Sequence, residues 1–275
     1  MQPWMATPTP APTGGSAAWG ARLRGHLLAA YAAVSMVCFF LVQLPVMLLT
    51  RSADFSIWLA RRAWAPSALW LAGSRLEIDD RAGFPEGPAI YVSNHESALD
   101  AWVLFRTIPR DGLRFIAKQE LFSIPVFGWY LRLARFVPVD RAHRARAVKA
   151  LEEAGRIVRA GTSLIAFPEG TRSADGRVQP FKKGPFVVAM EAGVPVVPIA
   201  IAGAAALNPK GRLEVHRGVI RVAVGAPLTP HDFSDKDALL REVRRRIIEL
   251  HLALGGLGGD VEDAVAGAGV EGARR

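Results

Sequence analysis

Residues 94–100, Asn-His-Glu-Ser-Ala-Leu-Asp, place an imidazole and a carboxylate five positions apart. They follow a short apolar run rich in β-forming residues at 89–93, and helical periodicity follows over 98–108. Side chains at such a strand-to-helix turn protrude into a crevice. If His95 lies in the turn and Asp100 in the first helical turn, the carboxylate fixes the imidazole tautomer. The other ring nitrogen is then free to act as a general base.

The same spacing is compatible with a simpler role for the aspartate. Ser97 and Asp100 have the spacing of a capping box, so the carboxylate could serve only to cap the helix. Spacing alone gives the two roles equal weight. Other chemistries lose support, because the chain has no Gly-x-Ser-x-Gly elbow, no second histidine of a zinc protease motif and no complete P-loop.

A second group of polar residues, Phe-Pro-Glu-Gly-Thr-Arg-Ser at 167–173, also comes directly after a predicted strand, at 163–167. Gly170 leaves backbone N–H groups accessible, and the Arg172 guanidinium can bind a phosphate through two hydrogen bonds. The segment therefore predicts an anion site, although an exposed surface turn would suit the same residues.

Helical and strand patterns alternate along the rest of the chain, which predicts an α/β fold. We expect a largely parallel mixed sheet flanked by helices, with the functional groups on loops at the strand ends. The last helix is expected to begin with a Ser-Asp-Lys-Asp capping box. The further predicted elements are helices at 145–159, 186–191 and 234–254, and strands at 194–201 and 219–224.

The N-terminal part predicts a membrane-associated helical hairpin. Residues 27–50 carry no charge and could cross about 30 Å of hydrocarbon, although Gln43 and Pro45 interrupt the run. A second apolar stretch at 55–71 carries tryptophans and arginines typical of a headgroup boundary. The length of this uncharged run argues against a cleaved signal peptide and against a buried core helix. The predicted organisation is a disordered lead (1–21), anchoring helices (22–75), an α/β domain (76–254) and a disordered tail (255–275).

Composition favours a lipid partner. The 275 residues are 51% hydrophobic and carry a net charge of +9, with a pI near 10.4 and a mean hydropathy of +0.20. This charge indicates anionic partners, and the absence of any nucleic-acid-binding signature ranks an anionic phospholipid membrane above nucleic acid. The single cysteine, Cys38, excludes a disulfide or a cysteine-rich metal site within one chain.

Taken together, the two motifs resemble those of the glycerolipid acyltransferase family that includes 1-acylglycerol-3-phosphate acyltransferases. Its marks, Asn-His-x4-Asp and Phe-Pro-Glu-Gly-Thr-Arg-Ser, are both intact. Two weaker blocks, at 136–141 and 194–199, appear in the family's order, and the resemblance covers roughly residues 85–225. Glu96 replaces a glutamine that is often found after the histidine, and Val-Pro-Val-Asp-Arg replaces a glycine-led Phe-Ile-Asp-Arg. These departures leave acceptor preference open.

The resemblance implies that His95 removes the proton of an acceptor hydroxyl, that Asp100 orients the ring, and that Pro198 and its neighbours shape the acyl-binding wall. No acyl-enzyme, metal or cofactor is expected. Lys118 is as compatible with a solvated lysine at the start of a helix as with a ligand role. The residues expected to bind substrate are Asn94, Lys118, Arg141, Glu169, Gly170, Thr171 and Arg172.

The function that the resemblance implies is acyl transfer from acyl-CoA or acyl carrier protein to the sn-2 hydroxyl of 1-acylglycerol 3-phosphate, giving phosphatidate. We expect it at the cell membrane, on the cytoplasmic face, where thioesters are made. Other acceptors are a lyso-ornithine lipid, lysophosphatidylinositol or glycerol 3-phosphate. A catalytically silent lipid-binding relative and a nucleic-acid-binding protein are the alternatives from other classes.

Overall fold

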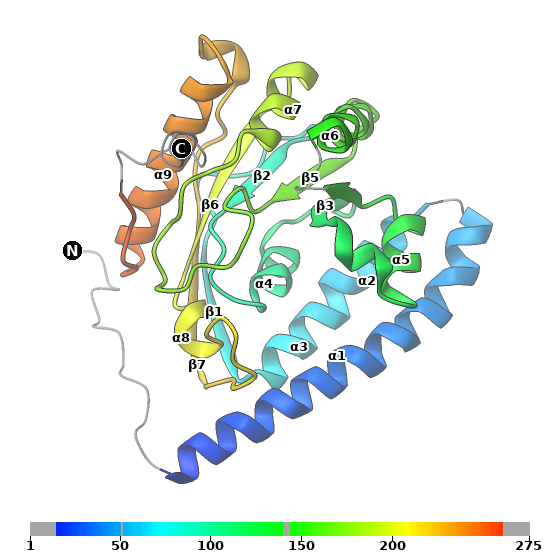
Figure 1. Cartoon of the computed structure of the whole chain (residues 1–275), viewed down its shortest axis with the longest axis vertical. Coiled ribbons are helices and arrows are strands. Elements are labelled where there is room, and N and C mark those ends of the chain that lie inside the picture. The colour runs from blue at the N-terminus through cyan, green and yellow to red at the C-terminus, as the bar shows by residue number, and fades with distance from the viewer. Residues whose placement is uncertain (1–14, 51, 140–143, 261–275) are drawn as a thin grey trace, which may run out of the picture.

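A computed structural model describes residues 15–50, 52–139 and 144–260, and its centre is a seven-stranded sheet (Figure 1). The strand order is β1-β7-β6-β2-β5-β3-β4, and every neighbouring pair is parallel except β6 and β7. The predicted fold class is confirmed. The strands are β1 Ser74–Asp79, β2 Ile90–Ser93, β3 Leu113–Lys118, β4 Val137–Val139, β5 Ser163–Ala166, β6 Val196–Ala202 and β7 Gly218–Val224.

Helices cover both faces of the sheet, so the central strands are buried on both sides. All residues of β2, β5 and β6 are buried, which explains why these strands are continuous apolar runs rather than alternating ones. Successive side chains of β2 enter different cores, with Ile90 and Val92 in one and Tyr91 in the other. One core lies under α6 (Arg144–Arg159), α7 (Gly184–Ala192) and α9 (Lys236–Ala253), and the other under α3 (Ala65–Leu71) and α4 (Asp100–Thr107).

The N-terminal segments form an antiparallel helical hairpin. Helix α1 (Gly15–Thr50) lies alongside a helical segment made of α2 (Asp54–Leu59), the π-turn η1 (Ala60–Trp64) and α3 (Figure 1). Three side-chain pairs hold the two arms together, and their sequence numbers converge toward the turn as an antiparallel arrangement requires. They are Tyr31 with Ser67 at 2.6 Å, Ser35 with Trp64 at 2.9 Å and Gln43 with Ser56 at 2.9 Å.

Helix α1 corrects the predicted N-terminal boundary, because it begins at Gly15 and so includes seven residues assigned to the disordered lead. Its first turns are fixed by the loop before β7. Arg22 pairs with Glu214 at 3.0 Å, and the Ala21 carbonyl accepts a hydrogen bond from the Val215 backbone. Residues 1–14 of the predicted lead lie outside the described residues.

The two residues that interrupt the apolar run, Gln43 and Pro45, do not break α1. Pro45 lies inside the helix, where its missing N–H leaves only the carbonyl four residues earlier without its usual partner. Gln43 is fully buried, and its Oε1 accepts a hydrogen bond from the Ser56 hydroxyl across the hairpin. The glutamine therefore joins the two arms instead of ending the first.

The start of the last helix and the end of the ordered domain also differ from the prediction. Helix α9 is capped by Asp235, whose carboxylate accepts hydrogen bonds from the backbone N–H groups of Asp237 and Ala238, rather than by the predicted serine at 234. Residues 255–260, expected to be disordered, pack against the domain, because the Gly258 carbonyl accepts a hydrogen bond from the Val178 backbone at 2.8 Å. The rest of the predicted tail, 261–275, lies outside the described residues.

The remaining short elements, apart from η2, were not predicted from the sequence, nor were β1, β3 and β4. Each is seven residues or fewer, too short for a periodic pattern to identify. They are α5 (Phe127–Leu133), α8 (Ala204–Leu207) and η3 (Pro230–Asp232), whereas η2 (Gln119–Ser123) corresponds to the helix expected at Lys118.

Candidate active site

The histidine and aspartate of the first motif meet at the end of β2. His95 Nδ1 lies 2.7 Å from Asp100 Oδ2, and the aspartate is fully buried at the start of α4. The same oxygen accepts hydrogen bonds from the backbone N–H groups of Glu96 at 2.7 Å and Ser97 at 2.8 Å. One carboxylate oxygen therefore performs both roles that spacing had left open. It organises the turn before the helix, and it holds the imidazole.

The ring of His95 presents its other nitrogen for chemistry. With the Nδ1 proton donated to Asp100, Nε2 carries the lone pair, and it has no hydrogen-bond partner in the described part of the chain. Phe167 stacks on the ring, with centroids 4.0 Å apart and an angle of 15° between the planes. The ring is thus held by a hydrogen bond at one nitrogen and by an aromatic face, and it lines a cavity.

The second motif meets the first because β2 and β5 are neighbouring parallel strands. The backbone N–H of His95 donates to Glu169 Oε1 at 3.1 Å, and its carbonyl accepts a hydrogen bond from the Ser173 backbone at 2.7 Å. Glu169 thus joins the two motif loops, and Gly170 makes the turn in a left-handed conformation, with φ of 78°.

The Glu169 carboxyl lies in a strongly desolvating place. Burial raises its pKa well above the usual value, and the charge of Asp100 adds to the rise, whereas the backbone N–H of His95 opposes it. Its Oε2 atom is buried without a partner in the described residues. The residue was expected to bind substrate, and the structure places it both beside the cavity and under the turn that carries His95.

Asn94 has a different place from the one predicted. It is buried and does not line the cavity. Its side-chain amide forms two hydrogen bonds of 2.8 Å with the backbone of Ile201 in β6, one donated and one accepted. An amide can pair in this way with both groups of an extended residue. The predicted substrate ligand is therefore a clamp between the catalytic turn and the sheet.

A cavity of about 960 Å³ begins at His95, which is near the upper end of the range of roughly 300–1,000 Å³ for ligand sites. Its lining combines polar side chains, most of them from the two motif loops, with a larger set of apolar ones. The polar part is lined by His95, Lys118, Glu169, Gly170, Thr171, Arg172 and Lys182. The apolar part is lined by Met36, Phe39, Ala60, Trp64, Ala98, Ala101, Phe105, Phe115, Ile116, Ala117, Leu121, Phe127, Tyr130, Leu131, Phe136 and Phe167.

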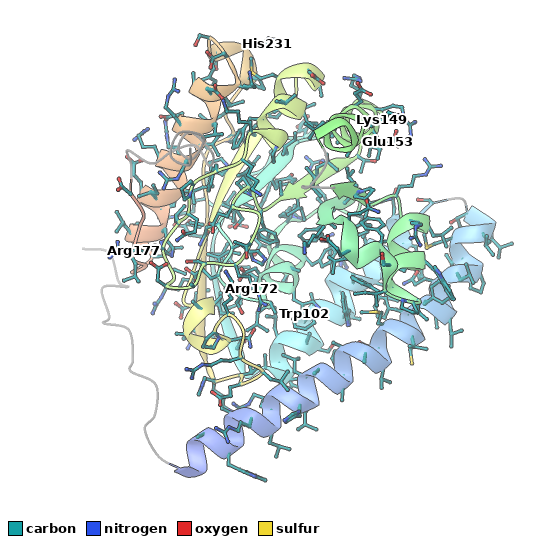
Figure 2. The ribbon with its side chains drawn as sticks, in the orientation of Figure 1. Trp102, Lys149, Glu153, Arg172, Arg177 and His231 are labelled. Carbon is teal, nitrogen blue, oxygen red and sulfur yellow. The ribbon has the colours of Figure 1, made fainter. Side chains whose placement is uncertain are left out.

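The cations expected at the site have different environments. Arg172, labelled in Figure 2, lines the cavity and has no ion-pair partner among the described residues. Lys118 also lines the cavity; it ends β3 and directly precedes η2, and its side chain pairs with Glu120 at 3.0 Å. Arg141 lies outside the described residues. Lys182, which sequence reasoning missed, adds a cation from the segment before α7.

The apolar wall also differs from the prediction. Pro198, expected to shape it, lies in β6 and does not line the cavity. The wall comes instead from the hairpin, through Met36 and Trp64, and from α4, β3, η2 and α5. Helical apolar spacing in 27–71 was the available signal, but spacing does not reveal which distant loop a helix packs against. The described residues contain no group of three or more histidine, cysteine, aspartate or glutamate side chains placed to hold a metal.

Such an arrangement, with an oriented base between a cationic loop and an apolar cavity, suits transfer of an acyl chain to a phosphate-bearing acceptor. The family model described as Acyltransferase matches residues 75–202. The chloroplast 1-acyl-sn-glycerol-3-phosphate acyltransferase of Brassica napus is 34% identical over 235 residues, which are 83% of this chain and 67% of that protein. The 1-acyl-sn-glycerol-3-phosphate acyltransferase of Pseudomonas aeruginosa is 34% identical over 167 residues, 59% of this chain and 64% of that enzyme.

A solved structure gives the same result. The crystal structure of the 1-acyl-sn-glycerophosphate acyltransferase of Thermotoga maritima superposes with a TM-score of 0.72 and 29% identity, covering 86% of this chain and 96% of that one. The chain belongs to the acyltransferase family of these 1-acyl-sn-glycerol-3-phosphate acyltransferases. The predicted family and enzyme class are confirmed.

Proposed function

We propose that the chain transfers a fatty acyl group from a thioester to the sn-2 hydroxyl of 1-acylglycerol 3-phosphate, giving phosphatidate. The observation that carries this proposal is the position of His95 Nε2. It lies where a loop bearing Arg172, a cation without an ion-pair partner in the described part of the chain, meets a largely apolar cavity. The names of the relatives support the same acceptor.

In the proposed reaction His95 acts as general base. Nε2 takes the hydroxyl proton as the acceptor oxygen attacks the thioester carbonyl, and Asp100 stabilises the imidazolium that forms. When the tetrahedral intermediate collapses, the carbon–sulfur bond breaks and the proton passes from Nε2 to the leaving sulfur. Atoms and charge balance without an acyl-enzyme, because the thioester is already activated and the site supplies proximity and a base.

The two parts of the cavity lining suit the two parts of the reactants. The apolar side chains of the lining suit an acyl chain, and its cations suit a phosphate. Arg172, the turn at Gly170 and the hydroxyl of Thr171 would bind the acceptor phosphate, with Lys118 as a further cation. The donor is acyl-CoA or acyl carrier protein, both of which are anionic and suit the net charge of +9.

The hairpin would bring the site to the bilayer. An 18-residue apolar window of α1 with a hydropathy of 2.3 is only 11% buried, unlike the core helix of a water-soluble protein. Trp129 and Leu133 of α5 extend the exposed apolar surface beside it, and Phe40 of α1 packs near Trp129. We propose attachment to an anionic phospholipid membrane, at the cell membrane with the catalytic domain on the cytoplasmic face.

The R172A variant tests the acceptor. Loss of a charge-assisted hydrogen bond costs about 1.5–3 kcal/mol, so we expect kcat/KM for 1-acylglycerol 3-phosphate to fall about tenfold or more. The same variant should lose little activity toward a monoacylglycerol, which has no phosphate. Initial rates with radiolabelled acyl-CoA and both acceptors measure the two ratios.

Two controls make this assay decisive. Arg177 is exposed and lies outside the cavity lining, so R177A should match the unsubstituted enzyme with both acceptors. An equal loss for both acceptors in R172A would contradict a phosphate contact. A strong preference of the unsubstituted enzyme for lyso-ornithine lipid, lysophosphatidylinositol or glycerol 3-phosphate would overturn the proposed acceptor.

The exposed face of α1 tests membrane attachment. Leu48 and Leu49 are 64% and 85% exposed, and burying two carboxylates among lipid chains is strongly unfavourable. We therefore expect the double variant L48E/L49E to lose most of its binding to anionic phospholipid vesicles in a flotation assay. The matched variant L252E changes an exposed leucine of α9 and should float like the unsubstituted chain. Unchanged flotation of L48E/L49E would contradict the proposed contact.

A further inference from the structure

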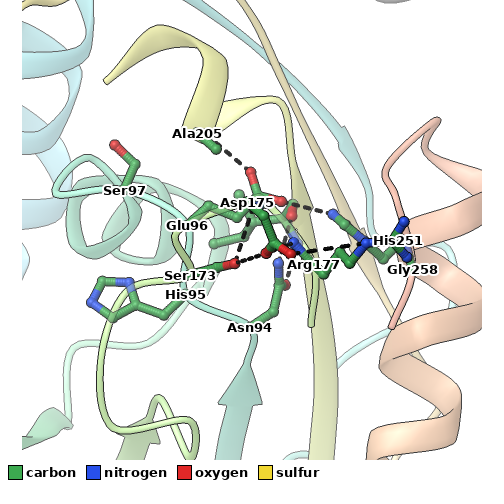
Figure 3. Close-up of polar contacts among 12 residues, drawn as sticks. Asn94, His95, Glu96, Ser97, Ser173, Asp175, Arg177, Ala205, His251 and Gly258 are labelled. Carbon is green, nitrogen blue, oxygen red and sulfur yellow. Dashed lines mark hydrogen bonds and ion pairs between the residues drawn. The ribbon is translucent and has the colours of Figure 1, made fainter. Parts of the chain in front are cut away.

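The side chain after the catalytic histidine turns away from the cavity. Glu96 is 3% exposed, and it extends toward the C-terminal helix while His95 lies on the other side of the turn (Figure 3). Its Oε1 lies 2.7 Å from His251 Nε2, and its Oε2 accepts a hydrogen bond from the Ala205 backbone at 3.1 Å. One peptide unit therefore separates the proposed base from a side chain held by α9.

The C-terminal segment fixes the tautomer of this second histidine. The backbone N–H of Gly258 donates to His251 Nδ1 at 3.1 Å, so the ring proton lies on Nε2 and is donated to Glu96. The segment wraps closely around the ring. A Cβ atom at Gly256 would lie 2.3 Å from His251 Nε2, and Gly258 has a φ of 66° that favours glycine.

A second connection runs from the same helix to the other side of His95. Arg244, seven residues before the histidine of α9 and so on the same helix face, is buried, and its Nε donates to the Gln179 carbonyl at 3.2 Å. The Gln179 backbone opposes the rise in the pKa of the Glu169 carboxyl, which accepts the hydrogen bond from the His95 backbone. Helix α9 thus also packs, through Arg244, on the segment that lies next to Glu169.

We propose that Glu96 and His251 are positioning residues, a buried pair that ties the catalytic turn to α9 and so fixes where His95 Nε2 lies relative to the acceptor hydroxyl. Neither residue lines the cavity, so they act through the backbone of the turn and not on substrate. The inference rests on the acyl transfer proposed above for its kinetic readout only.

The electrostatic environment of Glu96 supports a specific interaction with His251 rather than simple packing of two buried side chains. Burial raises the pKa of Glu96, while the hydrogen bond from His251 acts in the opposite direction. A buried carboxylate without its donor is strongly unfavourable, so loss of the His251 N–H would drive Glu96 to protonate or the turn to move. Either change displaces the residue next to the base.

This pair also explains a departure of the sequence. Glu96 replaces the glutamine that the family resemblance leads one to expect after the histidine. The side chain does not reach the cavity. Its two oxygens accept from two N–H donors, His251 Nε2 and the Ala205 backbone, and a glutamine amide has only one oxygen to accept them.

Two substitutions of His251 by side chains of similar size distinguish a positioning role from a packing role. H251L keeps most of the ring volume but leaves Glu96 without a donor, whereas H251Q keeps an amide N–H that can reach it. We expect H251L to lower kcat about 10- to 100-fold, as small displacements of reacting groups do, with KM for acceptor and donor changed less than twofold. H251Q should retain kcat within about threefold.

A second measurement, which needs no substrate, tests whether His251 orders the turn. Hydrogen–deuterium exchange of the peptide covering 93–100 should speed up in H251L and not in H251Q. The control L240A removes a buried apolar side chain from the same helix, so it should lower thermal stability without changing exchange at 93–100 or kcat.

Equal kcat losses in H251L and H251Q, or exchange in H251L that matches L240A, would overturn the positioning role. If the unsubstituted enzyme fails to acylate 1-acylglycerol 3-phosphate, the proposed acceptor is wrong, but the exchange comparison still decides whether His251 orders the turn.

Discussion

Replacing His95 with alanine is expected to lower kcat for acyl transfer by about 10²- to 10⁴-fold, the usual contribution of a positioned general base. The reason is geometric. Nε2 is the ring nitrogen left free by the contact with Asp100, and it faces the cavity where the cationic loop and the apolar wall meet. Initial rates with saturating acyl-CoA and 1-acylglycerol 3-phosphate measure the loss, and vesicle binding of H95A should be unchanged.

A histidine elsewhere serves as the control. His231 is exposed in η3 and lies outside the cavity lining, so H231A should keep full activity. Transfer by H95A at a rate close to that of H231A would reject general-base catalysis by this residue.

The substitution D100N is expected to lower kcat about 100-fold while leaving the local fold largely in place. An asparagine oxygen at the position of Oδ2 can still accept the hydrogen bonds from the backbone of Glu96 and Ser97. The negative charge that stabilises the imidazolium is lost, at a cost of about 1.5–3 kcal/mol for a charge-assisted hydrogen bond. The ring is also held less firmly, which adds to the loss.

Stability should change as well, because the new amide must occupy the site of Oδ1. That atom is buried and has no partner among the described residues, and an unsatisfied buried donor costs about 1–3 kcal/mol. Thermal unfolding of D100N should therefore begin at a lower temperature than that of D80N, an exposed control. A kcat for D100N equal to that of D80N would restrict Asp100 to the role of a helix cap.

The parts of the fold that could be predicted from sequence are those in which a local pattern determines the outcome. The strand before His95 and the strand before Phe167 were both recognised as short apolar runs, and they are adjacent and parallel. Their adjacency brings the two motif loops together, as expected for neighbouring carboxyl ends of a parallel sheet. Spacing alone did not decide between the two roles of Asp100, since one oxygen has both.

The features that sequence reasoning missed depend on contacts between distant segments. Asn94 carries a family motif position, and only its pairing with β6, more than 100 residues away, reveals that it is a clamp. Gln43 looked like an interruption of an apolar run until Ser56 supplied its partner. The ordered residues 255–260 carry no pattern at all beyond glycine, and the ring of His251 is what they enclose.

The shared wall of the cavity has a consequence for how the molecule can be divided. Met36 and Phe39 of α1 line the same cavity as Phe105 of α4 and Phe115 of β3. The hairpin therefore forms part of the cavity wall and is not a separate attachment segment. A version trimmed to the α/β domain for solubility would lack this part of the cavity wall, whatever the integrity of the turn that carries His95.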